Sequence, residues 1–215
     1  MGLLQLTYET QTRYALSFTS GGLLAREGVS IAALYLESRD WQLTRSQVVE
    51  ENLLQARTTS SLTRVTRETV QRLATFDDDE IELLVAGGPT EQHHLMWAAA
   101  CRRYALIGDF AEEVLRERYL VMTPTLGKDD FDRFITGKTL WHPELDGLRP
   151  STLRKLRQTL FRMLSEADLR SSTGDIIPAV ISERVSDVLC RHTASDLRFF
   201  PTMSPTVFSG NQVQR

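Results

Sequence analysis

Apolar residues along this chain recur at intervals of three and four positions, the spacing that places them on one face of an α-helix. In residues 22–38, for example, Leu24, Gly28, Ile31 and Tyr35 share one face, and charged residues occupy the others. The same pattern predicts helices at residues 22–38, 44–54, 59–75, 77–86, 90–104, 109–120, 129–136, 152–167 and 182–191.

Several of these helices have recognisable ends. Thr44 and Ser151 carry hydroxyl groups that are suited to cap the helices after them. The acidic run 77–82 suits a helix start, because carboxylates are favoured at the positive end of the helix dipole. Gly87-Gly88-Pro89 is the strongest break in the chain. We therefore predict a helical subdomain, a second helical subdomain and a loose tail, at residues 1–86, 87–200 and 201–215.

The stretch between the last two predicted helices suggests a more specific element. "LRSSTGDIIPAVIS", residues 169–182, is a small polar turn followed by a β-branched run. Helix, short hairpin and helix in this order are typical of a winged-helix-like element. The predicted fold class is mainly α, with two packed helical subdomains and the winged-helix-like element in the C-terminal one.

Composition fits a globular intracellular protein. Of the 215 residues, 41% are hydrophobic and 25% are charged, and the net charge is −3, so any basic footprint has to be local. Cys101 and Cys190 are far apart and form no CxxC pair, which argues against a zinc ribbon and a disulfide framework. The N-terminus has no signal-peptide pattern, and no run approaches the roughly 20 apolar residues of a membrane span. We expect a cytoplasmic protein without membrane contact.

The stretch "YALSFTSGGLLAREG", residues 14–28, passes from hydroxyl residues through two glycines into a helix. It lacks the lysine of a P-loop and the spacing of a dinucleotide-binding loop. Two interpretations stay open. In the first, the start of this helix binds an anion such as a nucleic-acid phosphate. In the second, the hydroxyl residues only cap the helix. The hydroxyl groups concerned belong to Ser17, Thr19 and Ser20.

Residues 149–170 form the one local charge anomaly of the chain. Leucines and methionine share one side of this predicted amphipathic helix, and most of its basic residues lie opposite. Such a helix beside a wing is typical of DNA-binding proteins. The alternative is a solvated basic face that pairs with acids elsewhere. The candidate contacts are Arg154, Lys155, Arg157, Gln158, Arg162 and Arg170, with a second basic set at Arg57, Arg64 and Arg67.

Catalytic chemistry leaves no signature in this sequence. His93 and His94 are adjacent and point about 100° apart on a helix, so they do not grip one metal ion together. "KDDFDRF", residues 128–134, lacks the glycine and glutamate of an EF-hand. We expect no enzyme activity, no catalytic residue, no metal and no cofactor.

Four longer strings of the sequence are characteristic: "LSFTSGGLLAREGVSIAALYLESRDW", "ENLLQARTTSSLTRVTRE", "CRRYALIGDFAEEVLRERYL" and "WHPELDGLRPSTLRKLRQTLFRMLSEADL". They resemble the BrxA family, small accessory components of bacteriophage-exclusion (BREX) defence systems. The resemblance covers residues 14–200 and implies a mostly helical protein with a helical arrangement similar to the antitermination factor NusB. It also implies BREX partners, including a methyltransferase, an ATPase and a phosphatase-like protein. It implies no catalytic residues.

Two functions remain as hypotheses. The first is a non-catalytic module, a monomer in isolation, that binds nucleic acid through the basic helix face, with DNA favoured over RNA. The second is a protein–protein adaptor within the defence complex that makes no nucleic-acid contact. The adaptor hypothesis predicts an exposed anchor among Trp41, Trp97 and Trp141.

Overall fold

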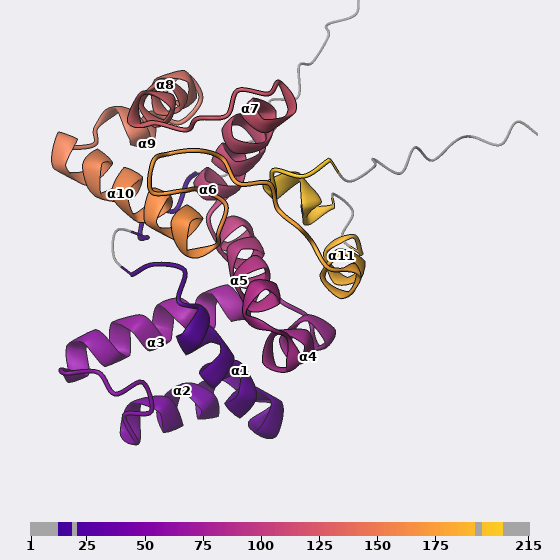
Figure 1. Ribbon diagram of the computed structural model, residues 1–215. Coiled ribbons are helices and arrows are strands. Elements are labelled where there is room, and N and C mark those ends of the chain that lie inside the picture. Colours follow the sequence, from indigo (N-terminus) through magenta and orange to yellow (C-terminus); the bar gives the residue numbers. More distant parts are fainter. Residues whose placement is uncertain (1–12, 19–20, 192–194, 204–215) are drawn as a thin grey trace, which may run out of the picture.

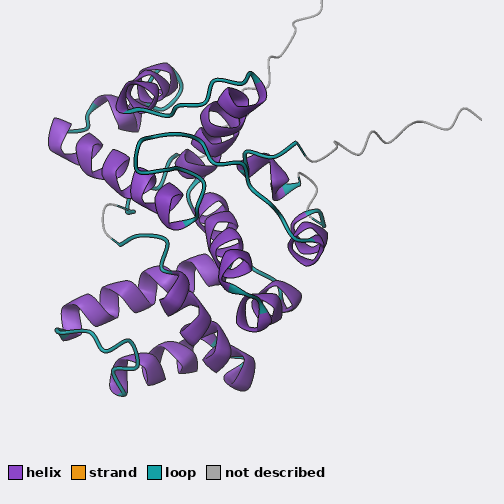
Figure 2. Ribbon diagram, in the orientation of Figure 1, coloured by secondary structure: helices purple, strands orange, loops and turns teal. Residues whose placement is uncertain are grey.

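The computed structural model describes residues 13–18, 21–191 and 195–203. Helices joined by loops make up most of this part of the chain, and no regular β-strand occurs within it (Figure 2). The mainly α fold class is therefore confirmed. Figure 1 shows one group of helices formed by residues 25–86 and another above it, with a central helix running between them. None of the described helices has both the length and the hydrophobicity that crossing a membrane requires.

The first group corresponds to the first four predicted helices. Its members are α1 (Ala25–Ser38), α2 (Trp41–Glu50), α3 (Thr59–Leu73) and α4 (Asp78–Ala86). α1 packs against the other three. The acidic run does start a helix: Asp77 accepts a hydrogen bond from Glu80 N at 2.9 Å, and Glu80 Oε2 accepts one from Asp77 N at 3.0 Å. This reciprocal pair is a capping box.

The predicted start of α2 at Thr44 is wrong. Asp40 caps the helix instead, because its carboxylate accepts hydrogen bonds from Gln42 N and Leu43 N at 2.6 and 3.1 Å. The ring of Trp41 stacks on Tyr35 at a centroid distance of 3.8 Å, so this residue belongs to the helix rather than to the break before it. Thr44 is buried inside the first turn.

The second group contains helices of very different lengths, from 4 to 17 residues. They are α6 (Ala105–Phe110), the π-helix η1 (Ala111–Arg116), α7 (Glu117–Leu120), α8 (Lys128–Lys138), α9 (Pro143–Asp146), α10 (Pro150–Glu166), α11 (Glu183–Leu189) and the 3₁₀-helix η2 (Asp196–Phe199). The first three follow one another without a break, where one helix from Asp109 was predicted. α10 begins at Pro150, whose fixed φ suits the first helical position, so Ser151 is not its cap.

The central helix α5 (Pro89–Arg103) explains why the two groups form one core. Its residues 94–101 are all buried, which is the pattern of a helix surrounded by others. α1 approaches it closely at Gly28, where an added Cβ would lie 2.6 Å from Met96 Sδ. α5 contacts α1, α3 and α4 as well as α6, α10 and α11. The predicted division into 1–86 and 87–200 stays a prediction.

The predicted winged-helix-like hairpin is reduced to a turn between α10 and α11. Arg170 and Ile176 form one isolated antiparallel bridge around this turn. The loop is hydrogen-bonded to another segment: Leu126 N donates to Gly174 O at 2.8 Å, and Ile176 N donates to Pro124 O at 2.7 Å. Inside the loop, Ser171 N donates to Asp175 O at 2.9 Å and Ile177 N donates to Leu169 O at 3.0 Å, so a short hairpin pairing is present but no regular strand forms in the described residues.

The predicted tail begins too early in the chain. Pro201 and Thr202 are buried, and Pro201 O accepts a hydrogen bond from Ala179 N at 2.9 Å. The remainder of the predicted tail, from residue 204, lies outside the described residues.

Candidate nucleic-acid interface

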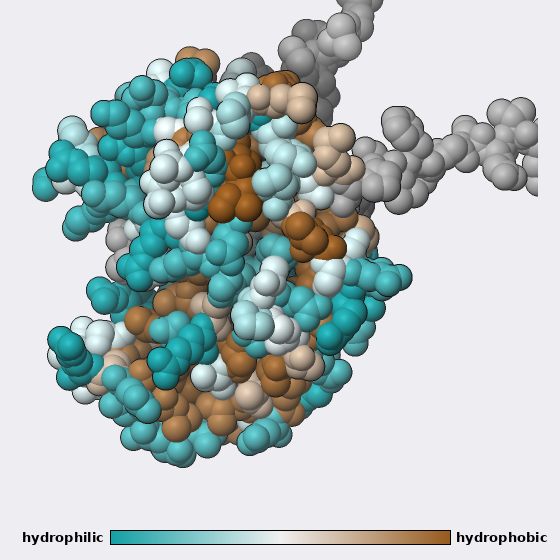
Figure 3. Space-filling model, viewed as in Figure 1, coloured by the Kyte–Doolittle hydropathy of each residue, from teal (hydrophilic) through white to brown (hydrophobic). Residues whose placement is uncertain are grey.

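A groove of about 450 Å³ is lined by residues of α3 and α10 and of the segments near them. In Figure 3 the molecule is indented between these two helices, and hydrophilic side chains lie on both flanks. We call this hollow the α3–α10 groove. Its polar lining includes Arg64 and Arg67 from α3, Arg103 from the last turn of α5, Lys155 from α10, and Ser17.

The periodicity of α3 explains its contribution. Arg64, Arg67 and Gln71 are spaced by three and four positions, so they share one face of the helix. That face is exposed, while Leu62 and Leu73 are buried on the other side. The helix therefore presents two guanidinium groups and an amide along one wall of the groove.

Glu68 is the one carboxylate among the described lining residues, and it is already engaged inside the protein. Glu68 Oε2 accepts a hydrogen bond from Tyr104 Oη at 2.7 Å, and Glu68 Oε1 accepts one from Arg72 Nε at 2.9 Å. Burial is the main reason why the pKa of Tyr104 is raised to about 12. The Glu68 carboxylate adds to this rise, and a hydrogen bond from Ser17 opposes it. The phenol therefore remains a hydrogen-bond donor at neutral pH. Glu68 therefore does not cancel the basic side chains of the groove.

Those basic side chains have no counter-ion among the described residues. Within the ranges that the structure describes, Arg64, Arg67 and Lys155 form no ion pair, and all three are exposed. Arg103 donates to the neutral amide of Gln71 at 3.2 Å and lies 5.0 Å from the centre of the Tyr104 ring. Four positive charges therefore converge on one hollow from three helices.

The anion site predicted at the start of α1 is filled by a carboxylate of the protein itself. Glu166 Oε2 accepts a hydrogen bond from Leu23 N at 2.5 Å. An added Cβ at Gly22 would lie 2.2 Å from the same oxygen, so the glycine allows this close approach. Ser17 is the one hydroxyl residue of the predicted site within the described residues, and it lines the groove; Thr19 and Ser20 lie outside them.

Half of the predicted basic face on α10 and the residues after it is occupied by internal contacts. Arg157 donates to both carboxylate oxygens of Asp132 at 2.7 and 2.9 Å, and Arg162 pairs with Glu166 at 2.8 Å. Arg170 donates to a backbone carbonyl and lies over the ring of Phe161 at 4.7 Å. These three guanidinium groups are therefore poor candidates for phosphate contacts.

The other predicted contacts divide into two kinds. Lys155 lines the groove, and so do Arg64 and Arg67 of the second basic set. Arg154, Gln158 and Arg57 are exposed but are not part of the lining. Arg72, which is near this set in the sequence but not on the same face of α3, is completely buried and donates to Gly22 O and Leu23 O at 2.9 and 3.1 Å.

Sequence reasoning missed Arg103. It sits in the last turn of α5, where a basic residue is explained by the helix dipole alone. The available signal was the pair Arg102-Arg103 ahead of the break at Tyr104, but only the packing of α5 beside α3 directs the second arginine toward the groove.

Metal binding finds no support in the described residues. Among them, no three His, Cys, Asp or Glu side chains gather as a metal ion would require. His93 Nδ1 lies 3.2 Å from Asp168, whereas His94 is buried with its ring against Phe200. The adjacent histidines therefore face different neighbours.

Comparison with known proteins gives a sequence family and a solved structure of similar fold. The sequence profile of the BrxA family matches residues 12–193. A protein named BREX protein BrxA from Escherichia coli O9:H4 (strain HS) is 28% identical over 147 residues, 68% of this chain and 69% of the relative. A second BREX protein BrxA, from Paramagnetospirillum magneticum (strain AMB-1), is 26% identical over 73% of this chain and 78% of its own length. The crystal structure of an uncharacterized protein from Magnetospirillum magneticum superposes with a TM-score of 0.72 at 26% identity, covering 83% of this chain and 92% of that one. The chain belongs to the BrxA family.

Proposed function

We propose that this chain is a non-catalytic component of a BREX phage-defence system and that it binds DNA along the α3–α10 groove. The observation that carries the proposal is the convergence of Arg64, Arg67, Arg103 and Lys155 around a hollow whose one acid, Glu68, is neutralised internally. Arginine and lysine are the side chains that bind phosphate oxygens most strongly. The binding that we propose therefore depends on the charge of the DNA backbone.

The BREX assignment follows from the relatives, which carry the name BREX protein BrxA. We accordingly propose that the partners of this chain include other subunits of the same defence system and that it works in the cytoplasm. Apart from the Glu68 carboxylate, which is engaged by Arg72 and Tyr104, the polar groups of the groove are guanidinium, ammonium, amide and hydroxyl groups, which favour binding of an anion over acid–base catalysis. This composition is why the proposed role is non-catalytic.

Duplex DNA fits the groove better than a single strand. Proteins that hold single strands stack the bases on aromatic side chains. The described lining holds no aromatic residue, and its apolar members are the aliphatic Leu24 and Val65. Contacts to phosphates carry no sequence information directly, so we propose weak sequence preference.

The test removes three positive charges from the groove and the same number elsewhere. The groove variant is Arg64→Gln, Arg67→Gln and Lys155→Gln. The control variant removes three exposed arginines outside the groove, whose side chains are 47%, 58% and 50% exposed: Arg39→Gln, Arg184→Gln and Arg191→Gln. Gel shifts over a range of salt concentrations, with duplex DNA and with RNA of the same sequence, give the slope of log K against log salt.

The groove variant is expected to flatten that slope by up to about 2.7, since each phosphate contact contributes about 0.9. The control variant is expected to keep the slope of the unmodified chain. Equal slopes for the two variants would show that general charge, and not the groove, attracts the DNA. Tighter binding of RNA than of DNA at the same salt concentration would reassign the ligand.

A further inference from the structure

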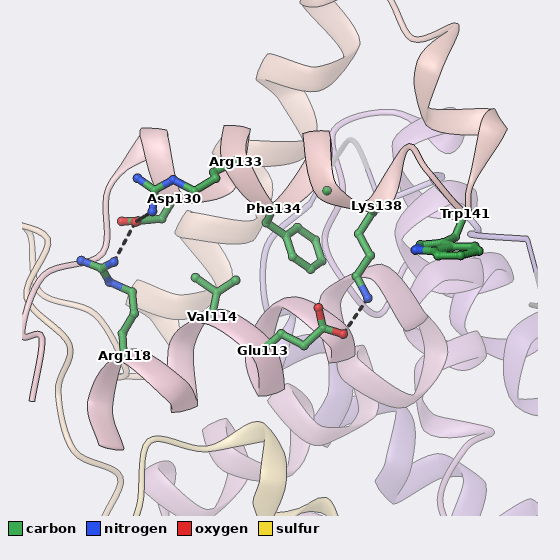
Figure 4. A pocket seen from close by; sticks show the side chains of 9 residues that line it. Glu113, Val114, Arg118, Asp130, Arg133, Phe134, Lys138 and Trp141 are labelled. Atoms are coloured by element: carbon green, nitrogen blue, oxygen red, sulfur yellow. Dashed lines mark hydrogen bonds and ion pairs between the residues drawn. The ribbon is translucent and has the colours of Figure 1, made fainter. Parts of the chain in front are cut away.

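A second hollow, of about 500 Å³, shares no lining residue with the α3–α10 groove. It lies between α8 and the helical run formed by η1 and α7 (Figure 4). Val114 and Phe134 face each other across its middle, Trp141 stands at one end, and Arg118 and Arg133 stand at the other. We call this hollow the α8 pocket.

Trp141 is the feature that distinguishes this pocket from an ordinary surface hollow. It is 66% exposed, and its neighbour Leu140 is 79% exposed. Trp97 is completely buried, and Trp41 is half-buried against Tyr35. Exposed tryptophan is costly in water and is enriched at the energetically dominant centres of protein interfaces. The adaptor hypothesis predicted one exposed tryptophan among these three, and the structure places it at this pocket.

The charges around the pocket leave one cation only weakly paired. Lys138 Nζ is 2.8 Å from Asp109 and 2.6 Å from Glu113, and Arg118 is 2.9 Å from Asp130. Arg133 is different: its side chain is 75% exposed, and it lies 3.7 Å from the same Asp130 oxygen that already binds Arg118. The pocket therefore offers an aromatic end and a positive end, separated by an apolar floor.

The wall opposite α8 has an unusual backbone. η1 is a π-helix of six residues, Ala111–Arg116, and it contributes Glu113 and Val114 to the pocket. π-Helical turns are rare and recur at functional sites, where they redirect side chains that a regular α-helix would place elsewhere. This observation is independent of the exposed tryptophan and points to the same place.

We propose that the α8 pocket binds a segment of a partner protein that carries an apolar side chain and a carboxylate. The apolar side chain packs among Val114, Phe134 and Trp141, and the carboxylate pairs with Arg133. The proposal rests on the proposed role beside other subunits of a defence system. It does not depend on DNA binding in the α3–α10 groove.

Gly137 makes the pocket testable without disturbing the fold. It lies in the last turn of α8 and lines the pocket. An added Cβ there meets no atom within 4 Å. Gly137→Leu therefore fills the pocket with an apolar side chain, and Gly137→Ala is a matched control that adds a single methyl group.

The probe is a set of short overlapping fluorescent peptides that together cover the other proteins of the same BREX system. Their binding to the full chain is measured by fluorescence anisotropy. We expect a peptide with an apolar residue and an acidic residue to bind. Trp141→Ala, Arg133→Glu and Gly137→Leu should each weaken it about tenfold or more, because the first two remove the proposed anchors and the third fills the pocket. Gly137→Ala should not weaken it. Replacing the acidic residue of the peptide by lysine should restore binding to the Arg133→Glu variant.

Several results would overturn the proposal: no peptide binds at millimolar concentration, the peptides that bind are basic, or Gly137→Leu leaves their binding unchanged. Binding that requires deletion of residues 1–12 would assign the pocket to that segment of the chain itself. The salt slope of DNA binding, measured on the same variants, separates this proposal from the first. It should stay unchanged when the pocket is filled, and peptide binding should stay unchanged when the groove is neutralised.

Discussion

Arg102 lies at the centre of a buried ionic network, and its removal should be among the most damaging single changes to stability. From α5 it donates to both oxygens of Glu80 in α4, at 2.8 and 2.5 Å. It also donates to Asp196 of η2 at 2.5 Å and to the carbonyl of Thr75 at 3.0 Å. The Glu80 side chain is 0% exposed and that of Asp196 is 5% exposed. Arg102→Met keeps the approximate length of the side chain and leaves the carboxylates without this partner.

The expected cost is about 3–5 kcal/mol, the range for breaking a buried ion pair from one side. For a domain of this size, 1 kcal/mol corresponds to roughly 2–4 °C in Tm, so the drop is roughly 6–20 °C. Arg39 provides the control, because it also pairs with two carboxylates, Asp78 and Glu82, but all three side chains are about half exposed. Arg39→Met should cost about 0–1 kcal/mol.

Urea unfolding followed by circular dichroism gives both free energies of unfolding, and thermal melts give the two Tm values. The reasoning is that burial, rather than the number of ion pairs, determines the penalty. Similar losses for Arg102→Met and Arg39→Met would refute it, as would a loss below about 1 kcal/mol for the buried site.

Three further changes probe other parts of the structure by urea unfolding. Gly22→Ala forces the Glu166 carboxylate off its backbone partner and should cost about 1–2 kcal/mol, while Gly88→Ala, where an added Cβ meets nothing within 4 Å, lacks this penalty. Burial, with a smaller effect of the neighbouring histidine, lowers the pKa of His94 from 6.5 to about 4. As the pH falls, the imidazole of His94 is therefore protonated in the unfolded chain before it is protonated in the folded chain. The free energy of unfolding should therefore decrease by up to about 3 kcal/mol between pH 6.5 and pH 4. The His94→Leu variant should lose less of its free energy of unfolding over this pH range than the unmodified chain. Gly137→Ala should stabilise α8 by up to about 1 kcal/mol, and a loss would mean that the position is not open.

Much of the helical fold could be predicted from the sequence because the signals are local. The spacing of apolar residues in 22–38 and 59–75 is determined by the buried side of each helix, and it leads to α1 and α3 with small errors at the ends. The start of α2 was missed because two adjacent signals compete there. Asp40 and Thr44 are both good caps, and the stacking of Trp41 on Tyr35 favours the earlier one.

The candidate site was harder to predict because its charges depend on distant partners. On a helical wheel Arg162 lies on the same face as Lys155, whereas Arg157 lies closer to the apolar edge. Asp132, 25 residues away along the chain from Arg157, neutralises that arginine, and nothing in the helix itself indicates this. Arg103 joins the site only through the packing of α5 beside α3. A groove between helices is a property of tertiary structure. Periodicity therefore identifies candidate residues, but it does not determine which of them line the groove.

The peptide units around Leu23 have a consequence for the groove. The N–H of Leu23 is bonded to Glu166 of α10, and its C=O is bonded to Arg72 of α3. One residue of the backbone thus ties together the two helices that face each other across the proposed DNA site. The separation of these walls is consequently determined before any ligand arrives, and a substitution in this turn should alter affinity for DNA without removing a single contact to it.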